Sequence, residues 1–177
     1  MKKIYRVLAA IAALSVLVSL LSACGKKGDG TSGSGTPAET HDYAVAVMPD
    51  ASGSTLKQEV TVKTYIDGDT THFNVPESIA AGGVLKARYL AVNTPESTGK
   101  IEEYGKASSR FTKEKLSGAS SIMIESDDGS WNLDSTGGRY LVWVWYRPEG
   151  SDTYRNLNIE LLQNGLAIAS SSANNRY

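Results

Sequence analysis

Apolar and polar residues alternate along most of the chain after residue 58, and this alternation predicts a β-rich domain. A period of two places successive side chains on opposite faces of a strand, so we expect five strands, at residues 60–66, 70–75, 84–92, 121–125 and 140–146. The last of these is apolar at both odd and even positions, which indicates burial on both faces. Trp143 and Trp145 within it are therefore expected to belong to the core.

Two further segments have the spacing of helices rather than strands. Tyr104, Ala107 and Phe111 recur on one side of the first, which is expected to stop at Gly118. The second covers residues 156–164 and is followed by Gly165. The predicted order is three strands, a helix, two strands and a helix. We therefore predict one α+β, mainly β domain over residues 59–177.

The N-terminus has the pattern of a secretory signal peptide over residues 1–23. Basic residues at the start are followed by a short apolar run, residues 7–21. The run ends in Leu21-Ser22-Ala23-Cys24, which resembles the bacterial lipoprotein box. This resemblance implies that Cys24 is lipidated and anchors the chain to the outer face of a bacterial cell membrane.

Residues 24–58 differ in composition from the segments on either side. Gly, Ser, Thr and Pro are frequent there and large apolar residues are few. Such a composition buries too little surface to offset the entropy lost on ordering. We therefore predict that the lipid-bearing cysteine is followed by a flexible tether to residue 58. Within it, residues 43–48 are compatible with a short strand.

Charge and cysteine content exclude several classes of function. The chain has 18 Lys+Arg and 19 Asp+Glu; residues 1–23 contain three of the bases and no acid, so 15 bases against 19 acids leave a formal charge of −4 without them. This balance argues against a strong non-specific nucleic-acid binder. Cys24 is the only cysteine and the two histidines, His41 and His72, are far apart in sequence. An intramolecular disulfide is therefore impossible, and a structural zinc site is not expected.

A tight turn with two carboxylates joins the first two predicted strands. It reads Ile66-Asp67-Gly68-Asp69-Thr70, and Asp-Gly is a strong turn signal. Such a turn is usually a solvated hairpin when it stands alone. A functional role for this turn is supported by features later in the chain. One of them is Arg88, which strand alternation places on the same face as Val84, Leu90 and Val92. An arginine among apolar residues must pair with a carboxylate or bind an anion.

Two more short motifs follow Arg88, namely Thr94-Pro95-Glu96 and Gly138-Arg139. In this order, the turn, Arg88 and the two motifs resemble the staphylococcal-type thermonuclease family. The resemblance covers residues 60–169 and includes the second helix with its Gly165-Leu166-Ala167 ending. It implies a five-stranded OB-type barrel with two helices. It also implies calcium-dependent cleavage of DNA and RNA phosphodiester bonds.

The resemblance also implies a role for each of these side chains. Asp69 and the carbonyl of Thr94 would bind Ca²⁺ directly, as oxygen ligands suit a hard cation. Asp67 would support the metal from behind, and Glu96 would activate or orient the attacking water. Arg88 and Arg139 would grip the phosphate with their planar forks. Asp134 would steady the loop that carries Arg139.

The sequence departs from the family pattern in three places. Asn93 stands where the family usually has aspartate, at a metal-ligand position; its amide offers an oxygen but no charge, so we expect weak binding of Ca²⁺. The stretch Ser170-Ser171-Ser172-Ala173 replaces aromatic residues. The sequence stops at Tyr177, where the family continues into a third helix, so we expect a domain that is short at its C-terminus.

These features lead us to expect a monomeric nuclease held at the cell surface. One alternative is an OB-type module that binds nucleic acid or protein with little or no turnover. Another is a structural envelope lipoprotein. The joint presence of Asp69, Arg88, Glu96 and Arg139 favours the enzyme, because a site without a substrate tends to lose its charged members.

Overall fold

The computed structural model describes residues 40–171. The predicted signal peptide and the lipidation of Cys24 lie outside the described residues, as does the part of the predicted tether before Thr40. The described chain belongs to one compact unit that starts at Thr40. Within residues 40–171, every helix is too short or too polar to cross a lipid bilayer.

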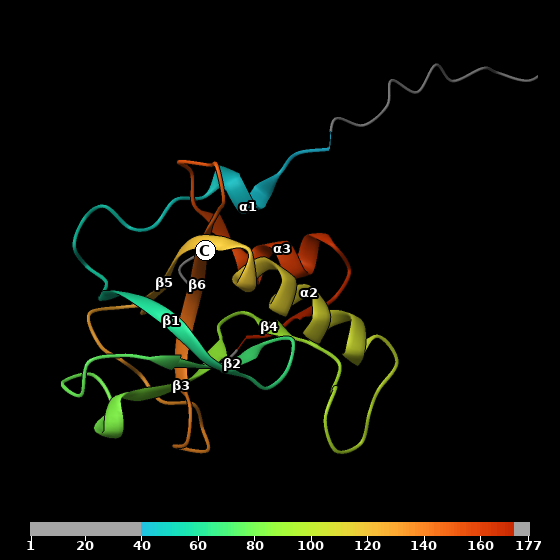
Figure 1. The fold of residues 1–177 in the computed structure, drawn as a ribbon, viewed down its shortest axis with the longest axis horizontal. Helices are drawn as coiled ribbons and strands as arrows, with labels where there is room; N and C mark the ends of the chain where they lie inside the picture. Colours follow the sequence, from blue (N-terminus) through green and yellow to red (C-terminus); the bar gives the residue numbers. More distant parts are fainter. Residues whose placement is uncertain (1–39, 172–177) are drawn as a thin grey trace, which may run out of the picture. The chain divides into compact units, whose positions relative to one another are not determined.

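The strands form a closed barrel. The sheet order is β3-β2-β1-β5-β6-β7, and a parallel pairing between β3 and β6 closes five of these strands into a ring (Figure 1). A separate two-stranded ladder joins β4 to β8. The strands are β1 (Lys57–Tyr65), β2 (Thr70–Asn74), β3 (Val84–Tyr89), β4 (Val92–Asn93), β5 (Ala119–Glu125), β6 (Tyr140–Pro148), β7 (Arg155–Asn156) and β8 (Ile168–Ala169). The predicted five-stranded OB-type barrel is confirmed.

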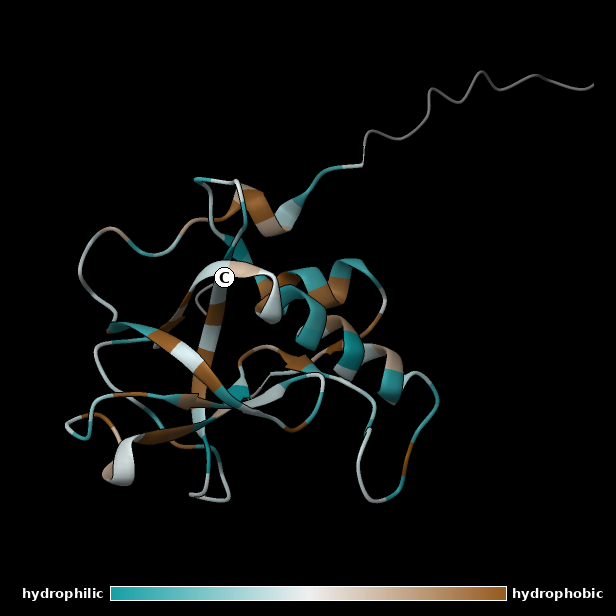
Figure 2. Ribbon diagram, in the orientation of Figure 1, coloured by the Kyte–Doolittle hydropathy of each residue, from teal (hydrophilic) through white to brown (hydrophobic). Residues whose placement is uncertain are grey.

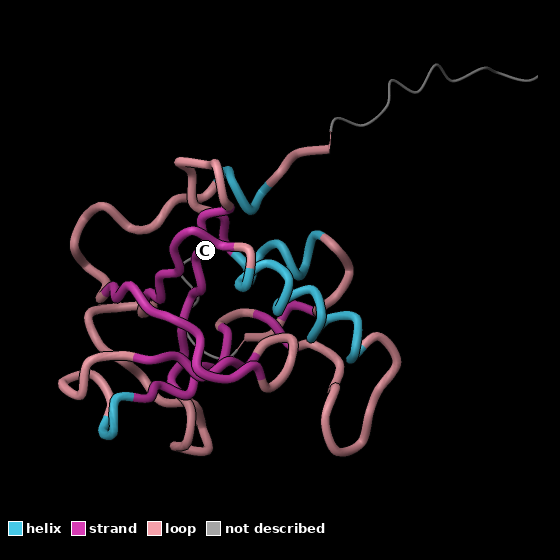
Figure 3. The backbone as a smooth tube through the Cα atoms, viewed as in Figure 1, coloured by secondary structure: helices cyan, strands magenta, loops and turns pink. Residues whose placement is uncertain are grey.

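Helices cover the barrel from outside. They are α1 (Tyr43–Ala46), α2 (Gly105–Ser117) and α3 (Leu157–Gln163), with a 3₁₀ turn, η1 (Ala81–Gly83), before β3. The predicted helices correspond to α2 and α3, which lie side by side, and α1 packs against α3 (Figure 1). A long loop connects β4 to α2 (Figure 3). The side chain of Asn156 caps α3 by accepting a hydrogen bond from the Ile159 N–H, so this helix begins one residue later than predicted.

The core fills the barrel and continues beneath α3. Hydrophobic residues lie along the strands, whereas the outer turns of α2 are hydrophilic (Figure 2). Strand β6 is buried at six successive positions, as its unbroken apolar run predicts. Trp143 and Trp145 are almost fully buried, which confirms their assignment to the core. Other fully buried members are Phe73, Leu85, Ala87, Tyr89, Ile124, Val142, Val144, Leu157 and Leu161.

The third predicted strand is interrupted, and this changes the expected setting of Arg88. Ala91 has a φ of 63°, a left-handed conformation that ends β3 before the chain resumes as β4. Within β3, the buried residues Leu85, Ala87 and Tyr89 alternate with the exposed Lys86 and the half-buried Arg88. The prediction that Arg88 sits on an apolar face is therefore wrong. It lies on the outer face, beside a cation.

The domain begins before residue 59, and the prediction of a flexible tether does not hold from Thr40 onward. The predicted possible strand is instead the helical turn α1, whose Ala44 is fully buried and donates its N–H to Gln163 Oε1 at 2.7 Å. Val47 packs against a cluster that contains Trp143 and Trp145. A few well-placed apolar side chains thus attach a segment whose average composition is polar.

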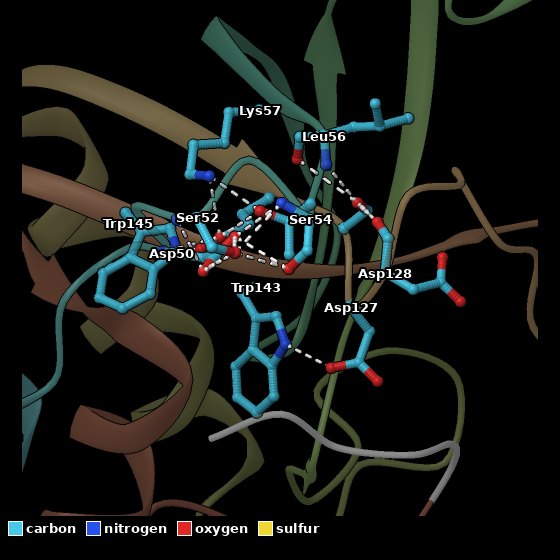
Figure 4. Close-up of polar contacts among 12 residues, drawn as sticks. Asp50, Ser52, Ser54, Leu56, Lys57, Asp127, Asp128, Trp143 and Trp145 are labelled. Carbon is cyan, nitrogen blue, oxygen red and sulfur yellow. Dashed lines mark hydrogen bonds and ion pairs between the residues drawn. The ribbon is translucent and has the colours of Figure 1, made fainter.

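A buried carboxylate supplies the polar part of this attachment. Glu125 is fully buried, and its Oε1 accepts hydrogen bonds from the Asp50 N–H at 3.0 Å and the Thr55 hydroxyl at 2.7 Å. Its Oε2 accepts the Trp145 indole N–H at 2.7 Å, and Lys57 Nζ lies 3.3 Å from Oε1 (Figure 4). The carboxylate is therefore both hydrogen-bonded and charge-compensated, as a buried charge must be.

We predict that Glu125→Ala lowers the free energy of unfolding by about 3–5 kcal/mol, because it leaves Lys57 without its buried counter-charge and three donors without an acceptor. Urea unfolding followed by far-UV circular dichroism measures the change. Glu114→Ala, which removes an exposed carboxylate from α2, is the matched control and should shift stability by no more than about 0.5 kcal/mol. Equal losses in the two variants would show that Glu125 does not hold the segment.

Candidate functional site

The turn between β1 and β2, which carries Asp67 and Asp69, is the first segment of the site along the chain. Its backbone closes through hydrogen bonds from the Ile66 and Asp67 N–H groups to the Thr70 carbonyl, at 3.2 and 3.0 Å. Gly68 lies so close to α2 and to the loop after β4 that a Cβ on it would come within 2.8 Å of Ser108 and Thr94. Glycine is therefore required for this close approach. The turn is thereby held against the helix.

Asp69 is the buried centre of the site. Its side chain is 1% exposed. Its Oδ2 accepts the backbone N–H of Thr94 at 2.8 Å, and its Oδ1 accepts hydrogen bonds from the Arg88 guanidinium and the Thr70 hydroxyl. Arg88 also donates from Nη2 to Asn93 Oδ1 at 2.6 Å. The prediction that Arg88 pairs with a carboxylate is confirmed, and the pair links the turn, β3 and β4.

Arg139 is held by a tight loop before β6. Its Nε donates to Asp134 Oδ2 at 2.7 Å, and its backbone N–H donates to Oδ1 of the same carboxylate at 3.4 Å. Thr136 adds a third hydrogen bond to Asp134, at 2.7 Å. The expected steadying role of Asp134 is confirmed. No hydrogen bond found within residues 40–171 uses the terminal nitrogens of Arg139, which leaves them to face an anion.

These contacts lower the pKa of the Asp134 carboxyl. Burial opposes its ionisation, but the hydrogen bonds from Thr136 and Arg139 and the positive charge of Arg139 outweigh burial and lower its pKa to about 2. The carboxylate is therefore ionised throughout the neutral range and keeps its hold on Arg139.

Glu96 is exposed, but its backbone is fixed. Its N–H donates to Glu102 Oε2 at 3.1 Å and its carbonyl accepts the Glu102 N–H at 2.9 Å. Gly105 packs against the same carbonyl so closely that a Cβ would lie 2.0 Å from the oxygen. Although Glu96 is largely exposed, the partial loss of solvent around its carboxyl, its hydrogen bond with Asp67 and the negative charges of Asp67 and Asp69 raise the pKa of Glu96, whereas Arg88 lowers it. Negative charge thus accumulates around Glu96.

One cavity of about 400 Å³ brings these groups together. Asp67, Arg88, Glu96 and Arg139 all line it, although they come from four separate parts of the chain. Asp69 lies behind it in contact with Arg88. The predicted catalytic side chains therefore meet in space.

The same cavity has two lining residues that sequence reasoning missed. His72 and Lys86 form part of its wall. Strand alternation gave a signal for one of them, since Lys86 lies two residues from the predicted site residue Arg88 on β3. The alternation of His72 with Phe73 predicts a solvated surface side chain, whereas the structure makes His72 half-buried.

The donor set around Asp69 fits a hard cation by its chemistry. The candidate ligands Asp69, Asn93 and Thr94 offer carboxylate, amide and carbonyl oxygens, which suit a hard cation, and the buried Thr94 Oγ1 has no hydrogen-bond partner among the described residues. However, both Asp69 oxygens already accept protein donors. No cluster of three or more His, Cys, Asp or Glu side chains within residues 40–171 is arranged to hold an ion. The assignment of Asp69, Asn93 and Thr94 as calcium ligands stays a prediction.

Comparison with families of known proteins gave one match. The family described as "Staphylococcal nuclease homologue" matches residues 86–177. The matched part contains Arg88, Glu96 and Arg139, whereas Asp67 and Asp69 lie before it. No curated protein matches the chain.

The Asp134–Arg139 pair gives a pH-dependent contribution to stability with a defined sign. The folded-state pKa of Asp134, about 2, is below its ordinary value of 3.8, so the pair stabilises the fold above about pH 4 and loses its effect as the pH falls toward 2. We predict that Asp134→Asn lowers the free energy of unfolding at pH 7 by about 1 kcal/mol or less, because the pair is partly exposed. The difference from the parent should shrink between pH 4 and pH 2.

Denaturant unfolding at a series of pH values measures this difference. Asp152→Asn removes an exposed carboxylate from the turn after β6 and is the control, with a small and pH-independent effect. A difference between parent and Asp134→Asn that stays constant down to pH 2 would contradict the ion-pair account.

Proposed function

The chain belongs to the staphylococcal nuclease family, and from this premise we propose that it is a calcium-dependent nuclease that hydrolyses the phosphodiester bonds of DNA and RNA. The observation that carries the proposal is the meeting of Arg88, Glu96 and Arg139 in one cavity with Asp67. Two forked cations beside a carboxylate are the groups that phosphodiester hydrolysis requires, since the reaction places charge on the phosphate oxygens and needs a positioned water.

In the proposed reaction, Arg88 and Arg139 bind the scissile phosphate. A guanidinium donates two parallel hydrogen bonds to phosphate oxygens and stays charged at all relevant pH values. Arg139 has its Nε fixed by Asp134, and its terminal nitrogens would contact the substrate. Arg88 is fixed by Asp69 and Asn93. Because the donors are held in advance, little reorganisation is needed as negative charge develops.

Glu96 orients the attacking water and accepts its proton. The Glu102 contacts and the close packing of Gly105 hold its backbone in place, so the carboxylate has a defined reach into the cavity. A raised pKa brings the carboxyl closer to the operating pH, which improves a general base. Asp67 contributes to that environment and supports the metal region from behind.

Asp69, Asn93 and the Thr94 carbonyl would hold the calcium ion. When bound, the ion supplies positive charge that neutralises the phosphate oxygens. Asn93 brings no charge and its Oδ1 accepts a hydrogen bond from Arg88, so we expect a lower affinity for Ca²⁺ than a site with aspartate at this position would have.

A second candidate function is nucleic-acid binding without turnover. The observation that favours it is the occupation of both Asp69 oxygens, by Arg88 and by the Thr94 N–H, which leaves that carboxylate no unused oxygen as the site stands. The two functions separate in one assay, since a binding module retains an oligonucleotide but does not shorten it.

We predict that the parent degrades plasmid and single-stranded DNA with calcium present, and that a chelator abolishes the activity. Glu96→Gln should lower the rate ~10²–10⁴-fold because it removes the base. Arg139→Lys should lower it ~10²–10³-fold because an ammonium cannot reproduce the planar fork. Glu77→Gln, in an exposed loop between β2 and β3, is the matched control and should retain the parent rate.

The rates are measured by gel or by release of acid-soluble nucleotides over a calcium titration. Undiminished activity in both site variants would show that the assigned residues do not catalyse. DNA that is bound but never cleaved by the parent would instead support the binding module.

We further propose that the protein is a monomer attached to the cell membrane through lipidated Cys24. The sequence Leu21-Ser22-Ala23-Cys24 supports this part of the proposal. Cys24→Ala should remove the chain from the membrane fraction or block its processing, as immunoblots of fractionated cells would show. Cys24→Ala protein that stays with the membrane at the parent level would exclude the lipid anchor.

A further inference from the structure

One wall of the site cavity carries a lysine and a histidine in register. His72 of β2 and Lys86 of β3 are direct partners in the antiparallel β2–β3 pairing, and the next pair on the same face is Thr70 with Arg88. All four residues line the same cavity. Lys86 and Arg88 are two residues apart along β3, which separates their Cα atoms by roughly 6.6 Å. This wall therefore continues directly from the residue assigned to the scissile phosphate.

Neither of these two side chains has an acidic partner in an ion pair within the described part of the chain. Other cations such as Lys57, Lys115 and Arg155 lie in ion pairs with acids, but neither His72 nor Lys86 belongs to any ion pair found within residues 40–171. The pKa of His72 is lowered by its partial burial and by the positive charges of Lys86 and Lys63. The unpaired positive charge on this wall is therefore that of Lys86, whereas Asp67 and Glu96 bring negative charge to another part of the same cavity lining.

An unpaired lysine next to the arginine assigned to the scissile phosphate favours a second anion at this wall. A nucleic-acid strand carries one phosphate per nucleotide, so a phosphate bound by Arg88 brings a neighbour into the same region. We propose that Lys86 and His72 form a subsite for the phosphate next to the scissile one, on the same strand of a nucleic-acid substrate. The proposal rests on the proposed function and adds to it a requirement for at least two consecutive phosphates.

The two residues contribute different chemistry to this subsite. Lys86 is exposed and charged, so its contact releases counterions from the nucleic acid and makes binding depend on salt. His72 is half-buried and carries a lowered pKa, so at pH 8 it is neutral and donates a hydrogen bond without adding to the salt dependence. The two variants should therefore weaken binding in distinguishable ways.

The test is the binding of a fluorescein-labelled single-stranded oligothymidylate, measured by anisotropy at pH 8 with a chelator so that no cleavage occurs. Lys86→Gln should reduce the slope of log K against log salt by about 0.7 relative to the parent. Between 50 and 200 mM salt, the affinity of the variant should thus fall about 2.6-fold less than that of the parent. His72→Gln should weaken binding with the parent slope.

Arg147→Gln is the matched control. Arg147 lies near the far end of β6, seven residues from Tyr140, which corresponds to roughly 23 Å along the strand. Its loss removes one positive charge from the protein without touching the cavity, so the slope should stay within error of the parent. A Lys86→Gln slope equal to that of the parent, or a Lys86→Gln change that Arg147→Gln reproduces, would overturn the subsite.

A second measurement separates this inference from the proposed catalytic function. One phosphate at a time in the oligonucleotide is replaced by an uncharged methylphosphonate. The parent should lose affinity at the phosphate contacted by Lys86, whereas Lys86→Gln should be insensitive at that position. If the parent fails to cleave DNA but this pattern is observed, the subsite stands and the nuclease assignment falls. If cleavage occurs but no position couples to Lys86, the nuclease stands and the subsite falls.

Discussion

The site depends on one buried carboxylate. Asp69 is almost completely removed from solvent, and an isolated charge in that position would be very costly. Its oxygens are satisfied by the Thr94 N–H and the Arg88 guanidinium, which belong to two other segments of the chain. The hairpin turn, the end of β3 and the loop after β4 are therefore fixed relative to one another by the need to compensate this charge. Glu96 follows Thr94 by two residues, so its position depends on the same contacts.

Much of this arrangement could be predicted from the sequence. Alternation located the five barrel strands, since each has one face or two faces in a continuous core. The residues of the site could be named because short motifs fall in a recognisable order, and Arg88 was expected to find a carboxylate. Alternation was misread at Arg88 itself, because Ala91 adopts a left-handed conformation that interrupts the strand between Tyr89 and Val92.

The remaining differences arise from contacts between residues far apart in sequence. The segment from Thr40 to Leu56 was expected to be a tether because average composition cannot show that Ala44 and Val47 meet apolar surfaces. Average composition also cannot show that the buried Glu125 accepts a hydrogen bond from the Asp50 N–H. His72 and Lys86 were missed for a related reason, since their position side by side becomes visible only once the β2–β3 register is known.

The position of the tryptophans has an optical consequence. Trp143 and Trp145 lie in the cluster that Val47 completes, and their indole N–H groups donate to Asp127 and Glu125 (Figure 4). None of the residues that line the site cavity is a tryptophan within the described part of the chain. The emission of these two tryptophans is therefore a local gauge of whether the N-terminal segment is docked, and a red shift would report its release. The third tryptophan, Trp131, lies in the loop before Arg139 and packs against the barrel core instead. Events at the site cavity are better followed by a probe carried by the substrate.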